Sequence, residues 1–268
     1  MKRVAICMRG ICKNTNINNK TGKIESIDYA LCIKSIFNNI INCNNNYTFD
    51  FYLHGWIGND EDIKNIINDY NPKKYILEKQ INFQKEFENI SNKDSIVKER
   101  YKHIKNKKEL NINLYFQTIY SYAYSISKSV ELLDNNIEYE YIISLRYDCN
   151  INKQINLARL ENSNIYTDYT GGHSPLFFGD FIFISSKENM MHFKDFYKFL
   201  KTKIYHNIDY KNWTKNIILN RKKTTTGRYE HGIYSNQMII AYYIQQFNNV
   251  KYSNVISYVN CNLNKTIQ

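Results

Sequence analysis

An arginine and an aspartate stand two residues apart at the end of an apolar run, and both can bind a charged ligand. The residues at 141–145 run directly into Arg146 and Asp148. A guanidinium can hold a phosphate through two parallel hydrogen bonds, and a carboxylate can bind a hard cation or a sugar hydroxyl. The spacing therefore favours a phosphate-bearing substrate, for instance a nucleotide-sugar. A surface ion pair at a strand end is the simpler alternative.

The apolar run predicts a buried strand, with the charged pair at its carboxyl end. In open α/β sheets, ligands bind at this end of the strands. Residues 3–8 form a similar run that is followed by Arg9 and Gly10. Glycine permits a tight turn and a close approach of the backbone, so Gly10 suits a turn that contacts a ligand. The alternative for Arg9 is a solvent-exposed arginine at a strand end.

Predicted helices alternate with the predicted strands. Residues 114–133 are the strongest helix, because their apolar residues share one face. Further helices are predicted at 27–41, 61–70, 187–200 and 235–247, and further strands at 49–56, 74–77, 165–168 and 179–184. This order predicts one Rossmann-related α/β domain over residues 1–268, with a mixed, mostly parallel sheet flanked by helices. Residues 82–113 and 201–231 are expected to be peripheral excursions.

The composition permits anionic partners. The 268 residues carry a formal net charge of +11, which favours phosphates, nucleic acid or an anionic surface. The positive residues are spread along the chain, so solvated lysine faces explain much of this charge. The 24 tyrosines interleave with lysines and could stack on bases. A nucleic-acid-binding protein is therefore an alternative function from a different class.

Several classes of protein are disfavoured. The six cysteines form no Cys-x-x-Cys pair, which is typical of a reduced, intracellular protein. The glycine patterns of dehydrogenases and of P-loop enzymes are missing. Arg9 interrupts the short N-terminal apolar run, so it is not a signal peptide, and no apolar stretch approaches the roughly 18 residues of a membrane span. We expect a cytoplasmic protein without a transmembrane segment.

The order of five short motifs resembles that of GT-A-type glycosyltransferases from bacterial polysaccharide loci and large DNA viruses. The motifs lie at 3–10, 49–56, 120–129, 145–148 and 179–183. Together they extend over roughly residues 1–247, and the resemblance depends on their order because each motif is short. It implies a GT-A-like fold, a donor of the UDP or GDP type and transfer of a hexosyl or deoxyhexosyl group. It also implies a glycan or glycoconjugate acceptor, and no stable nucleic acid partner.

The resemblance also bears on a metal cofactor. GT-A enzymes commonly bind Mn²⁺ or Mg²⁺ through Asp-x-Asp at a strand end, whereas here Arg146 stands in place of the first carboxylate. Arg146 could supply the positive charge that a metal otherwise brings to the diphosphate. Asp148 could still bind one metal ion with water and phosphate oxygens, or it could hold ribose hydroxyls. The C-terminal metal-binding histidine that is common in this fold is missing, because no histidine follows His231.

An inverting enzyme needs a carboxylate base to deprotonate the acceptor hydroxyl. Many GT-A enzymes offer it in a Glu-Asp pair at the start of a late helix, where this chain has Asn236 and Gln237. The base must therefore come from elsewhere: Asp180 is the first candidate, Glu230 the second and Asp168 the third. The alternative for Asp180 is a turn acid at the start of a strand. Loss of these carboxylates also makes a non-catalytic member of the fold an alternative.

Four further residues could line the ligand site. His173 follows the Gly-Gly sequence of an expected acceptor-side loop, and Lys128 lies on the helix that precedes the key strand. His173 could contact the acceptor or a phosphate. Lys128 could reach a phosphate, although an exposed helix lysine is the simpler interpretation. His54 and Trp56 end a predicted strand. A tryptophan at such a position is more often part of the core.

Overall fold

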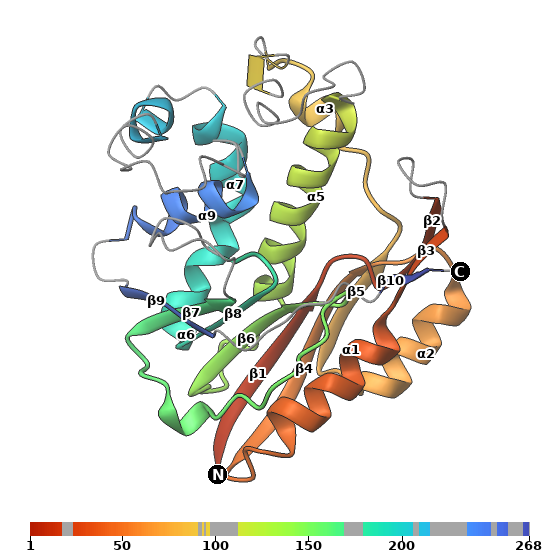
Figure 1. Cartoon of the computed structure of the whole chain (residues 1–268), viewed down its shortest axis with the longest axis vertical. Helices are drawn as coiled ribbons and strands as arrows, with labels where there is room; N and C mark the ends of the chain where they lie inside the picture. Colours follow the sequence, from red (N-terminus) through yellow and green to blue (C-terminus); the bar gives the residue numbers. More distant parts are fainter. Residues whose placement is uncertain are drawn as a thin grey trace.

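A seven-stranded sheet with the order β5-β4-β1-β6-β8-β7-β9 forms the centre of the computed structural model (Figure 1). The structure describes residues 1–17, 24–90, 93, 95–96, 112–168, 179–205, 209–214, 235–247, 251–256 and 265–267, with the main chain alone at 14–17, 24–28, 251–256 and 265–267. The strands are β1 (Lys2–Arg9), β4 (Tyr47–Trp56), β5 (Lys74–Glu78), β6 (Tyr141–Arg146), β7 (Asn164–Asp168), β8 (Ile182–Ser185) and β9 (Lys251–Ile256). Within this sheet β8 runs antiparallel to its two neighbours, and the other pairings are parallel.

Helices cover both faces of this sheet (Figure 1). They are α1 (Tyr29–Ile36) with a π-helical turn at Phe37–Ile41, α2 (Asp60–Tyr70), α3 (Gln84–Phe87), α5 (Ile112–Glu131), a short 3-10 turn at Leu157–Arg159, α6 (Lys187–Met191), a 3-10 turn at His192–Asp195, α7 (Phe196–Phe199), a π-helical turn at Leu200–Ile204 and α9 (Asn236–Ile244). Alternate residues of β1 enter different cores: Val4 and Ile6 pack with residues of α1 and α2, whereas Ala5 and Cys7 pack with residues of α5 and α7. Because a core covers each face of β1, its residues are apolar on both faces and form a continuous apolar run in the sequence.

Local capping explains how α2 begins and ends. The side chain of Asn59 accepts a hydrogen bond from the Asp62 amide. Three acidic residues in the first turn interact favourably with the positive end of the helix dipole. Asn71 then adopts a left-handed conformation with φ 43°, and Pro72 follows it. Such a C-cap before a proline ends a helix, because proline cannot continue it. The sequence therefore predicted α2 to within one residue.

The predicted fold class, a mixed and mostly parallel sheet flanked by helices, is confirmed. The predicted helix at 187–200 is instead divided into α6, a 3-10 turn and α7, which continue into a π-helical turn. The predicted helix at 27–41 begins only at Tyr29. Residues before it form β3 (Ile24–Asp28), which pairs with β2 (Lys13–Ile17) and β10 (Lys265–Ile267) in a small antiparallel sheet beside the C-terminus (Figure 1).

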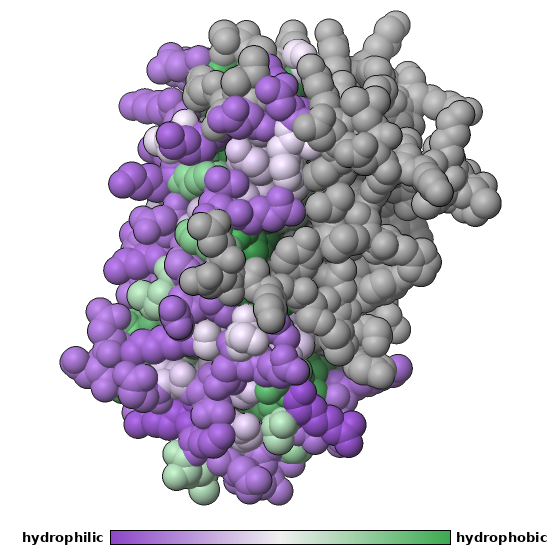
Figure 2. Space-filling model, turned by 90° about the vertical axis from the view of Figure 1, so that its left-hand side faces the viewer, coloured by the Kyte–Doolittle hydropathy of each residue, from purple (hydrophilic) through white to green (hydrophobic). Residues whose placement is uncertain are grey.

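Where residues are coloured by hydropathy, the face drawn in Figure 2 is mostly hydrophilic, and its apolar residues lie in small separate patches. Among the described residues, no helix is long and apolar enough to cross a membrane.

Candidate functional site

The carboxyl ends of β1 and β6 lie at a point where the order of the strands reverses. The chain passes from β1 to β4 and β5 on one side, and then returns through α5 to β6 on the other side of β1. Such a topological switch point leaves a crevice in which α/β proteins bind ligands. Arg9 and Arg146 are the last residues of the two strands and face each other in the register. The structure therefore brings together the two arginines that the sequence singled out.

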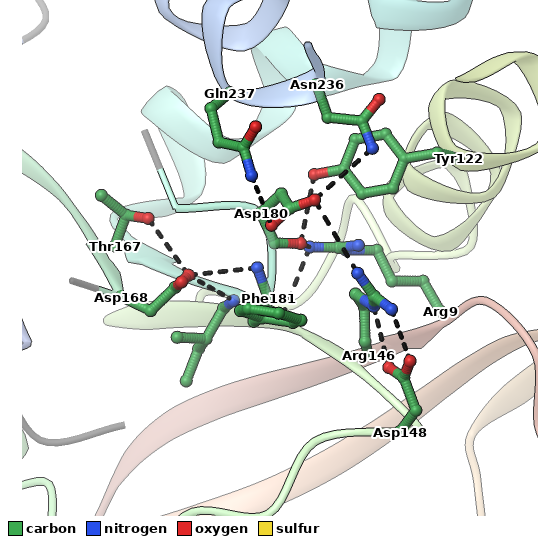
Figure 3. A network of polar contacts seen from close by, with 11 residues as sticks. Arg9, Tyr122, Arg146, Asp148, Thr167, Asp168, Asp180, Phe181, Asn236 and Gln237 are labelled. Atoms are coloured by element: carbon green, nitrogen blue, oxygen red, sulfur yellow. Dashed lines mark hydrogen bonds and ion pairs between the residues drawn. The ribbon is translucent and has the colours of Figure 1, made fainter. Parts of the chain in front are cut away.

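Arg146 is held between two carboxylates (Figure 3). Its Nε donates to Asp148 Oδ1 at 2.8 Å, and its Nη2 donates to Asp148 Oδ2. Its Nη1 lies 3.8 Å from Asp180 Oδ2, and the guanidinium lies 4.8 Å from the centre of the Phe181 ring. Burial disfavours the charge, but the carboxylates of Asp148 and Asp180 outweigh it and raise the pKa of Arg146. The side chain is 24% exposed, so Arg146 is partly accessible at this edge.

Arg9 is buried beneath this edge, with only 1% of its surface exposed. Its Nε donates to Ser144 Oγ at 2.9 Å, and its Nη2 donates to the main-chain oxygen of Asp180 at 2.9 Å. The guanidinium lies between the rings of Tyr122 and Phe183, at 5.1 Å from each centre. Tyr122 also donates to the Asp180 carbonyl at 3.2 Å. In this arrangement Arg9 positions Asp180 and does not itself offer an accessible charge.

The carboxylate of Asp180 faces the first turn of α9. Asn236 Nδ2 donates to its Oδ2 at 3.4 Å, and Gln237 Nε2 donates to its Oδ1 at 3.3 Å (Figure 3). These bonds are long, so the carboxylate is oriented without being tightly held. Asn236 Oδ1 is buried and has no hydrogen-bond partner among the described residues. The sequence placed both amides at the start of a late helix but did not show that they contact Asp180.

Asp168 holds the chain that carries Asp180. Its Oδ1 accepts hydrogen bonds from the amides of Phe181 and Ile182, both at 3.1 Å. Burial, with a further contribution from the charge of Asp180, raises the pKa of Asp168 to about 6. A Cβ at Gly179 would lie 2.2 Å from Asp168 Cγ, so only glycine allows this close approach. Asp168, the third candidate base, is thus committed to positioning the chain.

A chain of hydrogen bonds fixes the turn after β1. Gly10 has φ +99°, and its amide donates to Ser125 Oγ at 2.8 Å. Ser125 Oγ in turn lies 2.8 Å from His54 Nδ1, and His54 Nε2 lies 3.3 Å from Glu78 Oε1. Burial, aided by the charge of Lys128, lowers the pKa of His54 to about 3, so the ring is neutral. Ser125 is a positioning residue that the sequence did not reveal, because its partners are distant in the chain.

The remaining predicted residues lie elsewhere. Lys128 pairs with Glu131 on α5 at 2.6 Å, and its Nζ lies 5.6 Å from the centre of the Tyr124 ring. These contacts support the simpler interpretation of a helix lysine. Trp56 is buried and stacks on Tyr124, in agreement with a core role. Two predicted site residues fall outside the described residues: His173 and Glu230.

The residues at the predicted metal position do not fit a divalent cation as they are arranged. Both carboxylate oxygens of Asp148 bond to the guanidinium of Arg146, which places a positive charge where the cation would bind. Within the part of the chain that the structure describes, no group of three or more His, Cys, Asp or Glu side chains could hold a metal ion. A cation at Asp148 would therefore have to displace Arg146.

The chain resembles solved glycosyltransferases at low identity. The sequence matches no protein-family model and no curated protein. Mouse xyloside xylosyltransferase 1 in its apo form is 8% identical, with 95% of this chain and 84% of that chain covered and a TM-score of 0.41. The galactosyltransferase LgtC in complex with donor and acceptor sugar analogues is 11% identical, with 95% of this chain and 73% of that chain covered and a TM-score of 0.38. The glycosyltransferase GlyE of Streptococcus pneumoniae TIGR4 is 10% identical, with 95% of this chain and 46% of that chain covered and a TM-score of 0.36.

Proposed function

We propose that this protein is a glycosyltransferase that moves a sugar from a nucleoside-diphosphate donor, of the UDP or GDP type, to a hydroxyl of a glycan acceptor. The observation that carries the proposal is the position of the partly exposed Arg146 at the switch point of the sheet, where the buried Arg9 lies beside it in the register. Asp148 and Asp180 flank Arg146 at the same edge. A partly exposed guanidinium beside carboxylates suits a ligand that combines phosphate with hydroxyl groups.

Arg146 is proposed to stabilise the departing diphosphate. As the bond between the sugar and the phosphate breaks, negative charge grows on the leaving oxygen, and a charged donor already aimed at it lowers the barrier. A guanidinium can meet two phosphate oxygens at once. Arg9 acts as a positioning residue, because it donates to the main-chain oxygens of Asp180 and Phe181.

Asp180 is proposed as the base or as the anchor of the acceptor. Its carboxylate is oriented by Asn236 and Gln237 and lies 3.8 Å from Arg146. In an inverting reaction it would take the proton of the acceptor hydroxyl while the hydroxyl oxygen forms the new bond to the sugar. Glu230, outside the described residues, is the second candidate for this role.

The first test is binding of nucleotides. Thermal unfolding with UDP, GDP, dTDP and CMP, each with and without Mn²⁺, should show a rise in midpoint for one nucleoside diphosphate, since a ligand that binds the native state stabilises it. Arg146→Gln should weaken this binding by at least about tenfold, the usual effect of removing one partner of a desolvated charge pair. Arg159→Gln is the matched control, because Arg159 is exposed on a distant 3-10 turn.

The second test is turnover of the donor that binds. Asp180→Asn should abolish transfer while the nucleotide still binds, because the amide keeps the shape and cannot accept the proton. If no nucleotide shifts the midpoint of the wild-type protein, the proposal is wrong. Binding without turnover of any nucleotide-sugar would instead identify a non-catalytic member of the same fold.

A further inference from the structure

The ion pair of Arg146 and Asp148 occupies the part of the site where a diphosphate would bind. We propose that Asp148 takes the place of the phosphate in the free protein and is displaced by it, so that the diphosphate binds by an exchange of ion-pair partners without a divalent cation. This inference rests on the proposed function and gives Asp148 a role opposite to that of a metal ligand.

Asp148 occupies one of the two edges of Arg146 that can offer a pair of donors. Nε and Nη2 form this edge, and both bond to Asp148. The other edge, formed by Nη1 and Nη2, has the carboxylate of Asp180 beside it, with Oδ2 3.8 Å from Nη1. Carboxylate and phosphate fit the same two-donor edge of a guanidinium, so they compete for it.

The charges lead to the same conclusion. The cluster holds two arginines and three aspartates, Asp148, Asp168 and Asp180, so it carries no excess positive charge even when Asp168 is protonated. A diphosphate brings further negative charge into contact with the carboxylates next to Arg146. Coulomb repulsion at such distances is costly at a partly buried site. One carboxylate must therefore leave the guanidinium when the ligand arrives.

Asp148 is the carboxylate that can leave. Among the described residues, its carboxylate has hydrogen bonds only from Arg146, and it lies in the turn directly after β6. Asp180, in contrast, is also contacted by Asn236 and Gln237 of α9. When a phosphate replaces Asp148, Arg146 keeps two charge-assisted hydrogen bonds, and the released carboxylate is hydrated at the edge of the sheet.

The exchange predicts that removing the charge of Asp148 strengthens anion binding. We would measure by calorimetry the binding of inorganic pyrophosphate, and of the nucleoside diphosphate selected above, to wild type and to Asp148→Asn. In EDTA the variant should bind both ligands at least about tenfold more tightly, because the competing charge is gone. Added Mn²⁺ should give no further gain, and Arg146→Gln combined with Asp148→Asn should lose the binding.

Asp134→Asn is the matched control, since it removes the same charge from an ion pair with Lys74 at the opposite edge of the sheet, with 3.7 Å between Nζ and Oδ2. Its affinity should equal that of the wild type. Far-ultraviolet circular dichroism checks the fold, and Asp148→Ser serves as a second variant if Asp148→Asn fails to fold. Weaker or unchanged binding in the folded variant, or binding that requires Mn²⁺, would overturn the exchange.

The two ligands separate this inference from the proposed function. If Asp148→Asn tightens pyrophosphate binding but no nucleotide is preferred, the exchange stands and the glycosyltransferase assignment fails. If a nucleoside diphosphate binds the wild type only with Mn²⁺ and Asp148→Asn loses it, the assignment stands and the exchange fails.

Discussion

The amino ends and the carboxyl ends of the central parallel strands form two opposite edges of the sheet, which we call the amino edge and the carboxyl edge. Both carry arginine and aspartate, but in different arrangements. At the amino edge, Asp50 accepts hydrogen bonds from Arg3 Nη2 at 2.6 Å and from the Tyr139 hydroxyl at 2.9 Å. Lys73 lies 3.8 Å away, and Tyr52 and Tyr139 join their hydroxyls at 2.8 Å. One carboxylate of β4 is thus surrounded by donors from β1, from the segment before β5 and from the segment before β6, and it ties these elements together.

At the carboxyl edge, the carboxylate of Asp180 is paired less completely than that of Asp50. Asp180 contacts Arg146, Asn236 and Gln237 at 3.3–3.8 Å. Each edge also has a buried atom without a hydrogen-bond partner among the described residues, Arg3 Nε at the amino edge and Asn236 Oδ1 at the carboxyl edge. Burial, with a smaller contribution from the charge of Asp180, raises the pKa of Asp168. Incomplete pairing costs stability, and natural proteins accept such costs mainly at functional sites. The comparison therefore separates a structural cluster from a candidate ligand site, although both consist of arginine and aspartate at strand ends.

The largest expected effect tests how closely the carboxyl edge is packed. Gly179→Ala should lower the free energy of unfolding by about 4 kcal/mol, because the new Cβ would lie 2.2 Å from Asp168 Cγ and 2.5 Å from the Asp168 carbonyl oxygen. Chemical denaturation measures the loss. Gly58→Ala is the control, since nothing lies within 4 Å of a Cβ there and the stability should hardly change. Equal effects of the two variants would show that this edge has room to relax.

The next effect depends on pH. The ordinary pKa of Asp168 is 3.8, and burial raises it to about 6 in the folded protein. Between these values the folded state keeps a proton that the unfolded state loses, so stability falls as pH rises and stays lower above pH 6. Asp168→Asn keeps an oxygen that can accept the two amide hydrogen bonds and does not ionise. Its stability relative to the wild type should therefore rise by about 2 kcal/mol from pH 4 to pH 7.

Urea denaturation at several pH values between 4 and 7 measures this difference. Asp134→Asn, which removes a partly exposed carboxylate at the amino edge, should follow the wild type in parallel. If the difference in free energy of unfolding between Asp168→Asn and wild type does not vary with pH, ionisation of Asp168 carries no cost at the carboxyl edge. The contrast between the two edges would then weaken.

The smallest effect concerns the amino edge. Asp50→Ala should lower the free energy of unfolding by about 2 kcal/mol, mainly because the buried Tyr139 hydroxyl loses a charged acceptor. Arg3 and Lys73 are partly exposed, so their ion pairs add little. Nucleotide affinity should stay at the wild-type value, as measured by calorimetry. Glu140→Ala, which breaks the surface pair with Lys2, should cost about 0.5 kcal/mol or less. A loss of nucleotide binding in Asp50→Ala would mean that the two edges are coupled.

Local patterns in the sequence explain how much of the fold could be predicted. The runs at 3–8 and 141–145 are apolar because both faces of their strands are covered by helices, and each becomes a central strand. Residues 187–200 have helical periodicity but divide into short helical pieces, since periodicity does not show where the hydrogen-bonding pattern changes. The small sheet of β2, β3 and β10 was missed, because one of its pairings joins the two ends of the chain.

The site shows the same limit. Arg146, Asp148 and Asp180 were singled out from their positions at strand ends, and the structure places them in contact. The burial of Arg9 was not foreseen, because its partners Ser144 and Asp180 lie 135 and 171 residues away. Ser125 and Gly179 were likewise not predicted as positioning residues, since their roles depend on neighbours that only folding brings close.

The sequence by itself determined the alternation of strands and helices and the placement of polar residues at the carboxyl ends of the strands, because both follow from the order of nearby residues. Only the tertiary structure decided which of these ends meet, that Arg9 is buried whereas Arg146 is partly exposed, and that Asp180 approaches Arg146. The physical reason is that the partner of a charged group depends on the packing of segments far apart in the chain, whereas the tendency to form a strand or a helix is local.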